Sequence, residues 1–241
     1  MAELDRAGID VSASAMRALP IDAVLFDLDG TLADTAPDLG AALNRLRLGR
    51  GLDPVPILQL RSSSSHGARG LLRVGMGIAP EHPEYATLRD AFLAHYEAAL
   101  CVDSKLFAEV DALLDAIEAR SFKWGIVTNK ATRYTAPLLE QLGLSGRAGT
   151  VVCGDTTPYP KPHPAPLLAA AGQLGVAPAR CVYVGDAERD ITAGIAAGMR
   201  TIVARYGYIE AHESPETWPA DGGIDHPAAL LGWLPAHRTI T

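Results

Sequence analysis

Two carboxylates two residues apart, Asp27 and Asp29, are the side chains whose types and spacing most directly suggest chemistry in this sequence. They follow the apolar run 23–26, and Gly30 comes next, which allows the chain to leave a strand in a tight turn. Where two carboxylates stand at such an exit, one can attack an electrophile while the other exchanges a proton with the leaving group. The pair is therefore a candidate for combined nucleophilic and acid–base catalysis.

The same pair has two simpler explanations. Asp beside Gly is common in turns and at helix caps, so the pair alone is explained as well by a turn as by a site. A calcium-binding EF-hand loop is the second alternative. It fails because Gly30 stands at the fourth place rather than the sixth, and Asp38 stands at the twelfth, where a Glu is needed.

Three further apolar runs are followed by polar residues that suit a phosphate or metal site. In an open α/β sheet, ligands bind beyond the carboxyl ends of the strands, so such residues meet at one edge. One of them, a lysine, stands among four prolines that would present its ammonium group rigidly to a phosphate. The polar residues are Thr128 and Asn129 after the run 124–127, Lys161 after the run 150–153, and Asp186 and Asp190 after the run 181–184.

Each of these residues also has a structural explanation. Thr128 could be a strand residue or a helix N-cap, and Lys161 could be a solvent-facing lysine. Asp186 and Asp190 could favour the start of a helix through its dipole. The ordered set nevertheless favours a functional site. Because clustered carboxylates repel one another unless a cation neutralises them, and oxygen ligands select Mg²⁺, we predict a magnesium site.

The elements that must hold these residues follow from the periodicity of the apolar side chains. Five short apolar runs alternate with segments in which apolar residues recur at helical spacing. This alternation predicts parallel βαβ units, that is, an α/β fold with a doubly wound, Rossmann-like parallel sheet. The predicted strands lie at 23–26, 124–127, 150–153, 181–184 and 201–204, and the intervening helices include 110–117, 137–142 and 167–174.

The first two predicted strands are separated by far more chain than one crossover helix needs. Helical patterns at 39–48, 68–74 and 88–100, with few β-branched residues, predict a small α-helical cap in this interval. The leading residues are acidic and lack an apolar segment, which favours an extension outside the fold. The expected divisions are an N-terminal extension at 1–20, a catalytic core at 21–35 and 105–241, and the cap at 36–104.

The composition excludes several classes of protein. The formal charge of −7 argues against a nucleic-acid partner, because a phosphate-tracking surface needs clustered basic residues. No apolar run is long enough to span a membrane, and we expect a cytoplasmic protein, either a monomer or a homodimer. The three cysteines, Cys101, Cys153 and Cys181, lack the spacing of a zinc site or a disulfide framework, which fits a reducing compartment.

The candidate residues occur in the order of the motifs of a known family, and the chain resembles phosphatases of the haloacid dehalogenase superfamily. The predicted cap lies between the first motif and Thr128, as in the subclass with a helical cap. The resemblance runs from about Ala23 to Tyr208 and includes the motif from Asp27 to Thr31, then Thr128, Lys161 and the segment from Gly185 to Asp190.

The resemblance implies a role for each matching residue. Asp27 would attack phosphorus to form an aspartyl-phosphate, and Asp29 would protonate the leaving alkoxide and then deprotonate water. Lys161 would offset the negative charge of the phosphate and of Asp27. Thr128 would complete the catalytic set. The implied substrate ligands are Gly30, Thr31, Thr128 and Asn129. The implied Mg²⁺ ligands are Asp27, the backbone carbonyl of Asp29 and Asp186, with Asp190 either binding the metal or orienting a metal-bound water.

The expected substrate is a small phosphomonoester. The segments 105–107 and 206–208 resemble those of phosphoglycolate phosphatases and of the related N-acetylmuramic acid 6-phosphate phosphatases. Arg61, His66 and Arg69 in the cap are candidates for binding a substrate carboxylate, although they could simply be solvated. They favour 2-phosphoglycolate and a role in carbohydrate metabolism.

Three alternatives remain beside a phosphoglycolate phosphatase. The first is an N-acetylmuramic acid 6-phosphate phosphatase, and the second is a phosphomutase of the same fold. The third is a non-catalytic sensor of a phosphorylated ligand, which the intact pair of Asp27 and Asp29 disfavours. A metal-independent dehalogenase is disfavoured by Asp29 and the other carboxylates.

Overall fold

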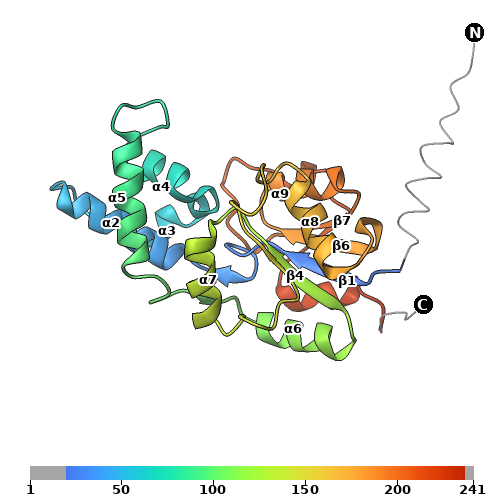
Figure 1. Ribbon diagram of the computed structural model, residues 1–241. Coiled ribbons are helices and arrows are strands. Elements are labelled where there is room, and N and C mark those ends of the chain that lie inside the picture. Colours follow the sequence, from blue (N-terminus) through green and yellow to red (C-terminus); the bar gives the residue numbers. More distant parts are fainter. Residues whose placement is uncertain (1–19, 237–241) are drawn as a thin grey trace, which may run out of the picture.

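The computed structural model describes residues 20–236. The expected N-terminal extension, apart from Pro20, lies outside the described residues. The described chain forms a core built on a sheet and a group of helices beside it (Figure 1). None of the helices in the described part of the chain combines the length and the apolar character that a membrane span requires.

A parallel sheet of six strands forms the centre of the core and confirms the predicted α/β class. Its order is β5-β4-β1-β6-β7-β8, so the first strand lies in the middle and the chain winds outward to both sides. Phe26 of β1 pairs with Ile126 and with Val184, so three strands end at one edge. The strands are β1 (Ala23–Phe26), β4 (Lys123–Val127), β5 (Val151–Val152), β6 (Cys181–Gly185), β7 (Arg200–Ala204) and β8 (Gly222–Ile224).

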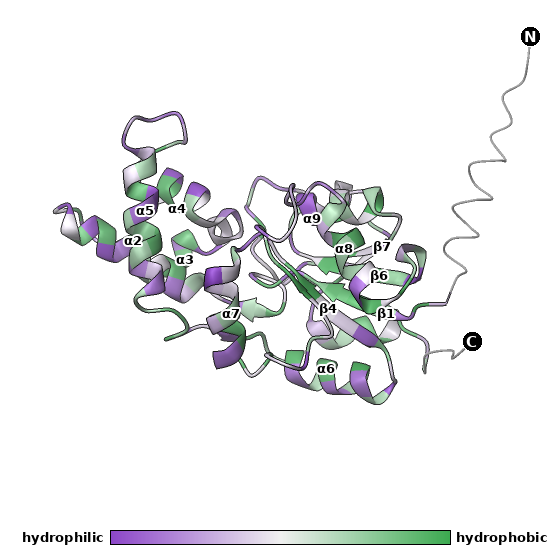
Figure 2. Ribbon diagram, in the orientation of Figure 1, coloured by the Kyte–Doolittle hydropathy of each residue, from purple (hydrophilic) through white to green (hydrophobic). Residues whose placement is uncertain are grey.

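Helices cover both faces of the sheet. Val24 and Phe26 pack in one hydrophobic cluster with α6, α7 and the 3-10 helix η4. Ala23 and Leu25, which point the other way, pack with α8 and α9. Burial on both faces explains the almost uniformly apolar strands, which are largely green at the centre of Figure 2. The helices are α6 (Val110–Ala119), α7 (Thr132–Gln141), α8 (Ala165–Leu174), α9 (Glu188–Ala196) and η4 (Pro227–Gly232).

The segment 36–97 is entirely helical or looped and is called the cap below. Its buried residues form a separate cluster around Leu43, Leu72 and Phe92, which also includes Tyr134 from α7 of the core. The helices of the cap are α2 (Ala36–Gly49), α3 (Ile57–Leu60), η1 (Ser62–His66), α4 (Gly67–Met76) and α5 (Tyr85–Glu97).

A short antiparallel ribbon connects the cap to the core. It consists of β2 (Ala33–Asp34) and β3 (Lys105–Leu106), one on each side of the cap in the sequence. Asp38 at the start of α2 accepts hydrogen bonds from the backbone of Asp103 and Ser104, which ties the two connections together. The chain therefore enters and leaves the cap at the same place.

The five predicted strands are all present, whereas β2, β3 and β8 were not predicted. The two ribbon strands have two residues each, and β8 contains two glycines and one apolar residue, so none produces a recognisable period. Cys153 and Cys181 are buried free thiols, and Cys101 is partly buried.

Candidate active site

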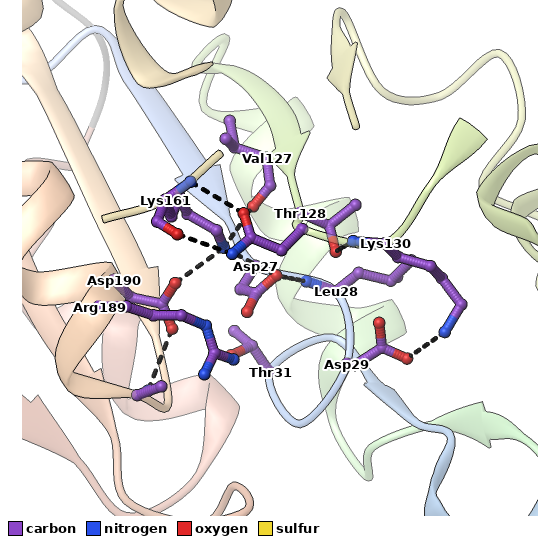
Figure 3. Close-up of polar contacts among 12 residues, drawn as sticks. Asp27, Leu28, Asp29, Thr31, Val127, Thr128, Lys130, Lys161, Arg189 and Asp190 are labelled. Atoms are coloured by element: carbon purple, nitrogen blue, oxygen red, sulfur yellow. Dashed lines mark hydrogen bonds and ion pairs between the residues drawn. The ribbon is translucent and has the colours of Figure 1, made fainter. Parts of the chain in front are cut away.

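Asp27 follows β1 directly and lies at the edge where the central strands end. Its backbone N–H donates to the carbonyl of Val184 at 2.9 Å, which continues the pairing with β6. The carboxylate is buried, and its Oδ1 accepts the N–H of Leu28 at 2.8 Å. Burial, partly opposed by Lys161, raises the pKa of Asp27. The residue is fixed by the sheet and aimed into the site (Figure 3).

Lys161 lies between two carboxylates in the interior. Its Nζ is 3.0 Å from Asp27 and 2.7 Å from Asp190, and the side chain is fully buried. The same ammonium donates to the carbonyl of Val127 at 2.8 Å and to the hydroxyl of Tyr183 at 2.6 Å. A buried charge needs such partners, and the lysine offsets part of the negative charge of the site.

Asn129 holds the loop that carries the lysine. Its Nδ2 donates to the backbone carbonyl of Lys161, and its Oδ1 accepts the backbone N–H of the same residue, both at 2.9 Å. Both ends of the amide are thus engaged by the protein. This geometry gives Asn129 a positioning role, and its donation to a phosphoryl oxygen stays a prediction.

Three buried carboxylates fit a divalent cation. Ligand oxygens of Asp27, Asp186 and Asp190 lie within 4.8 Å of one another. Burial, together with repulsion from Asp27 and Asp190, raises the pKa of Asp186 to about 8. A cation would relieve this repulsion, and a set of oxygen donors suits Mg²⁺. The predicted contribution of the Asp29 carbonyl stays a prediction.

Neighbouring residues hold these metal-site carboxylates in place. Asp186 accepts the N–H of Tyr208 at 2.8 Å and the hydroxyl of Thr31 at 3.3 Å. Gly30 has a φ of +85°, and a Cβ there would lie 2.1 Å from Asp186 Oδ2, so glycine is required. Thr31 and Gly30 thus lie beside the three candidate metal ligands Asp27, Asp186 and Asp190, which are called the metal group. Neither Thr31 nor Gly30 lines the cavity next to these ligands.

Asp29 points away from this group and toward the cap. Its Oδ1 accepts hydrogen bonds from Lys130 Nζ at 2.7 Å and from the hydroxyl of Thr35 at 2.5 Å. The ammonium of Lys130 also lies 4.8 Å from the centre of the Tyr96 ring. Burial by itself would lower the pKa of Lys130. The attraction of Asp29 and the contact with Tyr96 outweigh this effect, so the pKa of Lys130 is raised.

Lys130 was missed by the sequence reasoning. The available signal was its position directly after the polar pair Thr128 and Asn129, at the start of the loop that leaves β4. Thr128 lines the site, and its hydroxyl oxygen accepts the N–H of Lys130 at 3.1 Å, so the hydroxyl hydrogen is available for another acceptor.

A cavity of about 560 Å³ joins these residues to the cap. Its core side contains Asp27, Asp29, Thr128 and Lys161, so both candidate catalytic carboxylates face it. Its cap side carries the aromatic and apolar residues Phe92, Leu93 and Tyr96, with Tyr134 from α7 beside them. The cavity thus has a polar end at the sheet and a mostly apolar wall.

The three cap residues predicted to bind substrate are not all on this wall. His66 and Arg69 line the cavity. Burial and the charge of Arg189 lower the pKa of His66. Arg61 instead donates to both oxygens of Asp34, at 2.7 and 2.8 Å, and its guanidinium lies 5.1 Å from the centre of the Tyr208 ring. Arg61 therefore lies at the connection between cap and core, where the ribbon residue Asp34 engages it.

The core fold, the aspartate after the first strand and the buried acidic group define a hydrolase of the haloacid dehalogenase-like type. The profile of the haloacid dehalogenase-like hydrolase family matches residues 24–204. The chain therefore belongs to the haloacid dehalogenase-like hydrolase family.

Named relatives extend over nearly the whole chain. An N-acetylmuramic acid 6-phosphate phosphatase of Pseudomonas aeruginosa is 41% identical over 219 residues, which are 91% of this chain and 97% of the relative. A phosphoglycolate phosphatase of Xanthomonas campestris pv. campestris is 44% identical over 214 residues, 89% of this chain and 96% of the relative. A crystal structure described as a predicted phosphoglycolate phosphatase from Haemophilus somnus has a TM-score of 0.78 and 27% identity, and covers 90% of this chain and 99% of that chain.

Proposed function

We propose that the protein is a Mg²⁺-dependent phosphatase that hydrolyses a small phosphomonoester through an aspartyl-phosphate. The observation that carries this proposal is the division of the carboxylates. Asp27 lies with the metal group and Lys161, whereas Asp29 lies apart with Lys130 and faces the same cavity. This separation supports a mechanism in which one carboxylate attacks phosphorus and the other exchanges a proton with the departing group.

The residues suggest how both halves of the reaction proceed. An oxygen of Asp27 bonds to phosphorus while the bond to the leaving oxygen breaks, and Asp29, as the general acid, transfers a proton to that alkoxide. Water then attacks phosphorus, Asp29 takes a proton from it, and the bond to Asp27 breaks to release phosphate. Mg²⁺ held by Asp27, Asp186 and Asp190 would supply positive charge for the bound phosphate. Lys161 keeps Asp27 and Asp190 from repelling each other.

The cavity supports a substrate larger than 2-phosphoglycolate. Its volume of about 560 Å³ lies within the range of about 300–1,000 Å³ typical of sites for drug-sized ligands. An apolar wall that includes Phe92, Tyr96 and Tyr134 has nothing to contact in a two-carbon acid but can pack against a substituted sugar ring. We therefore place N-acetylmuramic acid 6-phosphate first. We place 2-phosphoglycolate second, because the guanidinium of Arg69 and the imidazole of His66 on the cavity wall could bind its carboxylate.

A kinetic comparison of the two substrates tests the proposal. With Mg²⁺, we expect phosphate release from both compounds and a kcat/KM at least about 10-fold higher for N-acetylmuramic acid 6-phosphate, since a few well-packed groups contribute about 1–3 kcal/mol. A higher kcat/KM for 2-phosphoglycolate would reverse the order of the substrates. Isomerised sugar phosphate without free phosphate would indicate a mutase, and tight binding without turnover would indicate a sensor.

The substitution Asp27→Asn tests the nucleophile. We expect activity to fall by a factor of about 10⁴ or more, as when a covalent nucleophile is lost. Asp225→Asn is a matched control, because Asp225 is an exposed carboxylate paired with Arg205 and lies outside the cavity wall. Turnover retained in Asp27→Asn would exclude the proposed covalent route.

A further inference from the structure

Arg189 reaches from the core to the cap at the edge of the active site. It lies in the first turn of α9, directly before Asp190, and lines the same cavity as Asp27. Its Nη2 donates to the carbonyl of Ser65 at 2.8 Å and to the Ser65 hydroxyl at 2.9 Å. Figure 3 shows the guanidinium beside Asp27 and Asp190, on the side of Thr31. A cap residue therefore holds a core arginine next to the nucleophile.

The guanidinium has unused hydrogen-bonding capacity. Arginine carries five N–H donors, and within residues 20–236 the acceptors of Arg189 both belong to Ser65 and both bond Nη2. Within the same residues, Arg189 forms no ion pair with a carboxylate, although Asp190, Asp27 and Asp186 attract it over a longer distance. These carboxylates favour the charge of Arg189, and its unbonded N–H groups are available to the oxygens of a bound ligand.

The ammonium group of the neighbouring Lys161 is already engaged by the protein. Lys161 has three N–H donors, and four oxygens already surround them, from Asp27, Asp190, Val127 and Tyr183. Within the cavity wall, the hydroxyl of Thr128 can donate one hydrogen bond. Beside the positive charge that Mg²⁺ would supply, a bound phosphoryl group has oxygens that can accept further hydrogen bonds. The planar fork of an arginine matches phosphate oxygens well.

We propose that Arg189 is a catalytic residue that binds the transferring phosphoryl group, and that Ser65 of the cap orients it for this contact. This inference rests on the proposed phosphatase function. Because Ser65 lies in η1 of the cap, the phosphoryl site is complete only when η1 lies against α9. Arg189 thus links cap docking to transition-state stabilisation.

Binding of inorganic phosphate, measured by calorimetry on the full chain with Mg²⁺, tests this proposal without turnover. We expect Arg189→Ala to weaken phosphate binding at least about 10-fold and to lower kcat/KM about 100- to 1,000-fold on every phosphomonoester. Added guanidinium ion should restore part of the activity of Arg189→Ala. Arg189→Lys, which keeps the charge without the fork, should show a smaller loss and no rescue, and it serves as the test variant if the alanine variant fails to fold.

Arg73→Ala is the matched control. Arg73 also connects cap and core, through Glu210 at 3.4 Å, but it does not line the cavity. Its loss should leave phosphate affinity and guanidinium response unchanged. Wild-type phosphate affinity in the Arg189 variants would overturn the proposal. This holds even if the variants bind a carboxylate-bearing substrate less well, because Arg189 would then contact the carboxylate and not the phosphoryl group. If phosphate binding depends on Arg189 but no phosphomonoester is hydrolysed, the phosphatase proposal fails and the anion site stands.

Discussion

Lys130 and Lys161 each hold one carboxylate of the active-site pair, and their surroundings differ. Lys161 lies deep in the core and touches Asp27. Lys130 lies at the boundary with the cap, where it contacts Asp29 and the face of Tyr96. At the residue scale, this division separates the proposed nucleophile from the proposed acid–base group, and we infer that Lys130 positions Asp29.

The substitution Lys130→Met tests that role. Without its ammonium partner, Asp29 loses the contact that aims its carboxylate, so we expect kcat to fall about 10- to 100-fold, part of the typical gain from acid–base catalysis. Phosphate binding should change little, because Lys130 bonds Asp29 and not the metal group. Lys123→Met is the control, since Lys123 donates to the carbonyl of Leu174 and lies outside the cavity wall. An unchanged kcat in Lys130→Met would contradict the assignment.

At the scale of elements, two chain segments meet at Asp186, one of the three candidate metal ligands. The turn after β1 passes Gly30, and the loop after β7 passes Gly207, and both pack against Asp186. A Cβ on Gly207 would lie 2.3 Å from Asp186 Cβ and 2.5 Å from the carbonyl oxygen of Gly30. The turn after β1 and the loop after β7 can therefore approach this closely only because both residues lack side chains.

Gly207→Ala should therefore disturb both stability and activity. The added methyl group meets backbone and a short side chain, so we expect unfolding free energy to fall by about 1–3 kcal/mol and the Mg²⁺ requirement for half-maximal activity to rise. Gly172→Ala in α8 provides the contrast, because its Cβ would have no atom within 4 Å and the helix should gain about 0.5–1 kcal/mol. Denaturant melts of both variants measure this. If Gly207→Ala were as stable as Gly172→Ala, the close approach of the chain at Gly207 would not require a glycine.

The whole molecule combines a rigid core with a cap that touches it at several polar points. Glu210, in the chain after β7, accepts the hydroxyl of Ser63 at 2.9 Å and lies 3.4 Å from Arg73. Arg61 and Asp34 form a second point at the ribbon, and Arg189 with Ser65 forms a third. Each of these three points joins a residue of the cap to a residue outside it through polar groups.

The buried acidic group makes global stability depend on pH and on metal. The pKa of Asp186, about 8, lies above its ordinary value of 3.8, so the folded state holds more protons than the unfolded state between these values. The stability of the metal-free protein should therefore fall as pH rises from about 6 to about 8. Mg²⁺ at about 100 times its Kd should restore about 2.7 kcal/mol, which is a rise in Tm of about 5–10 °C for a chain of this length.

Thermal melts with EDTA and with Mg²⁺ measure both effects. Asp186→Asn removes the titrating group and one ligand, so its Tm should depend little on Mg²⁺ and less on pH over this window. Asp115→Asn, which changes an exposed carboxylate paired with Arg147, should behave as the wild type does. A metal-free Tm that rises with pH would contradict the assigned direction.

Much of the fold was predictable because its signals are local. The central strands are buried on both faces, so they are continuous apolar runs, and the helices between them show apolar residues at helical spacing. The edge strand β8 and the ribbon strands gave no such signal, since pairing with a neighbour, and not side-chain pattern, makes them strands. The order of the sheet and the register at its edge could not be read from any single segment.

The sequence by itself determined which residue types follow the strand ends, and hence that Asp27, Asp29, Asp186 and Lys161 belong to one kind of chemistry. The tertiary structure decided which donors are already occupied. It turned Asn129 to the lysine loop and Arg61 to the ribbon. Within residues 20–236, it left Arg189 with N–H groups beyond the bonded Nη2 that have no acceptor. The physical reason is that a hydrogen bond depends on the distance and direction between groups far apart in the chain, and only packing fixes these.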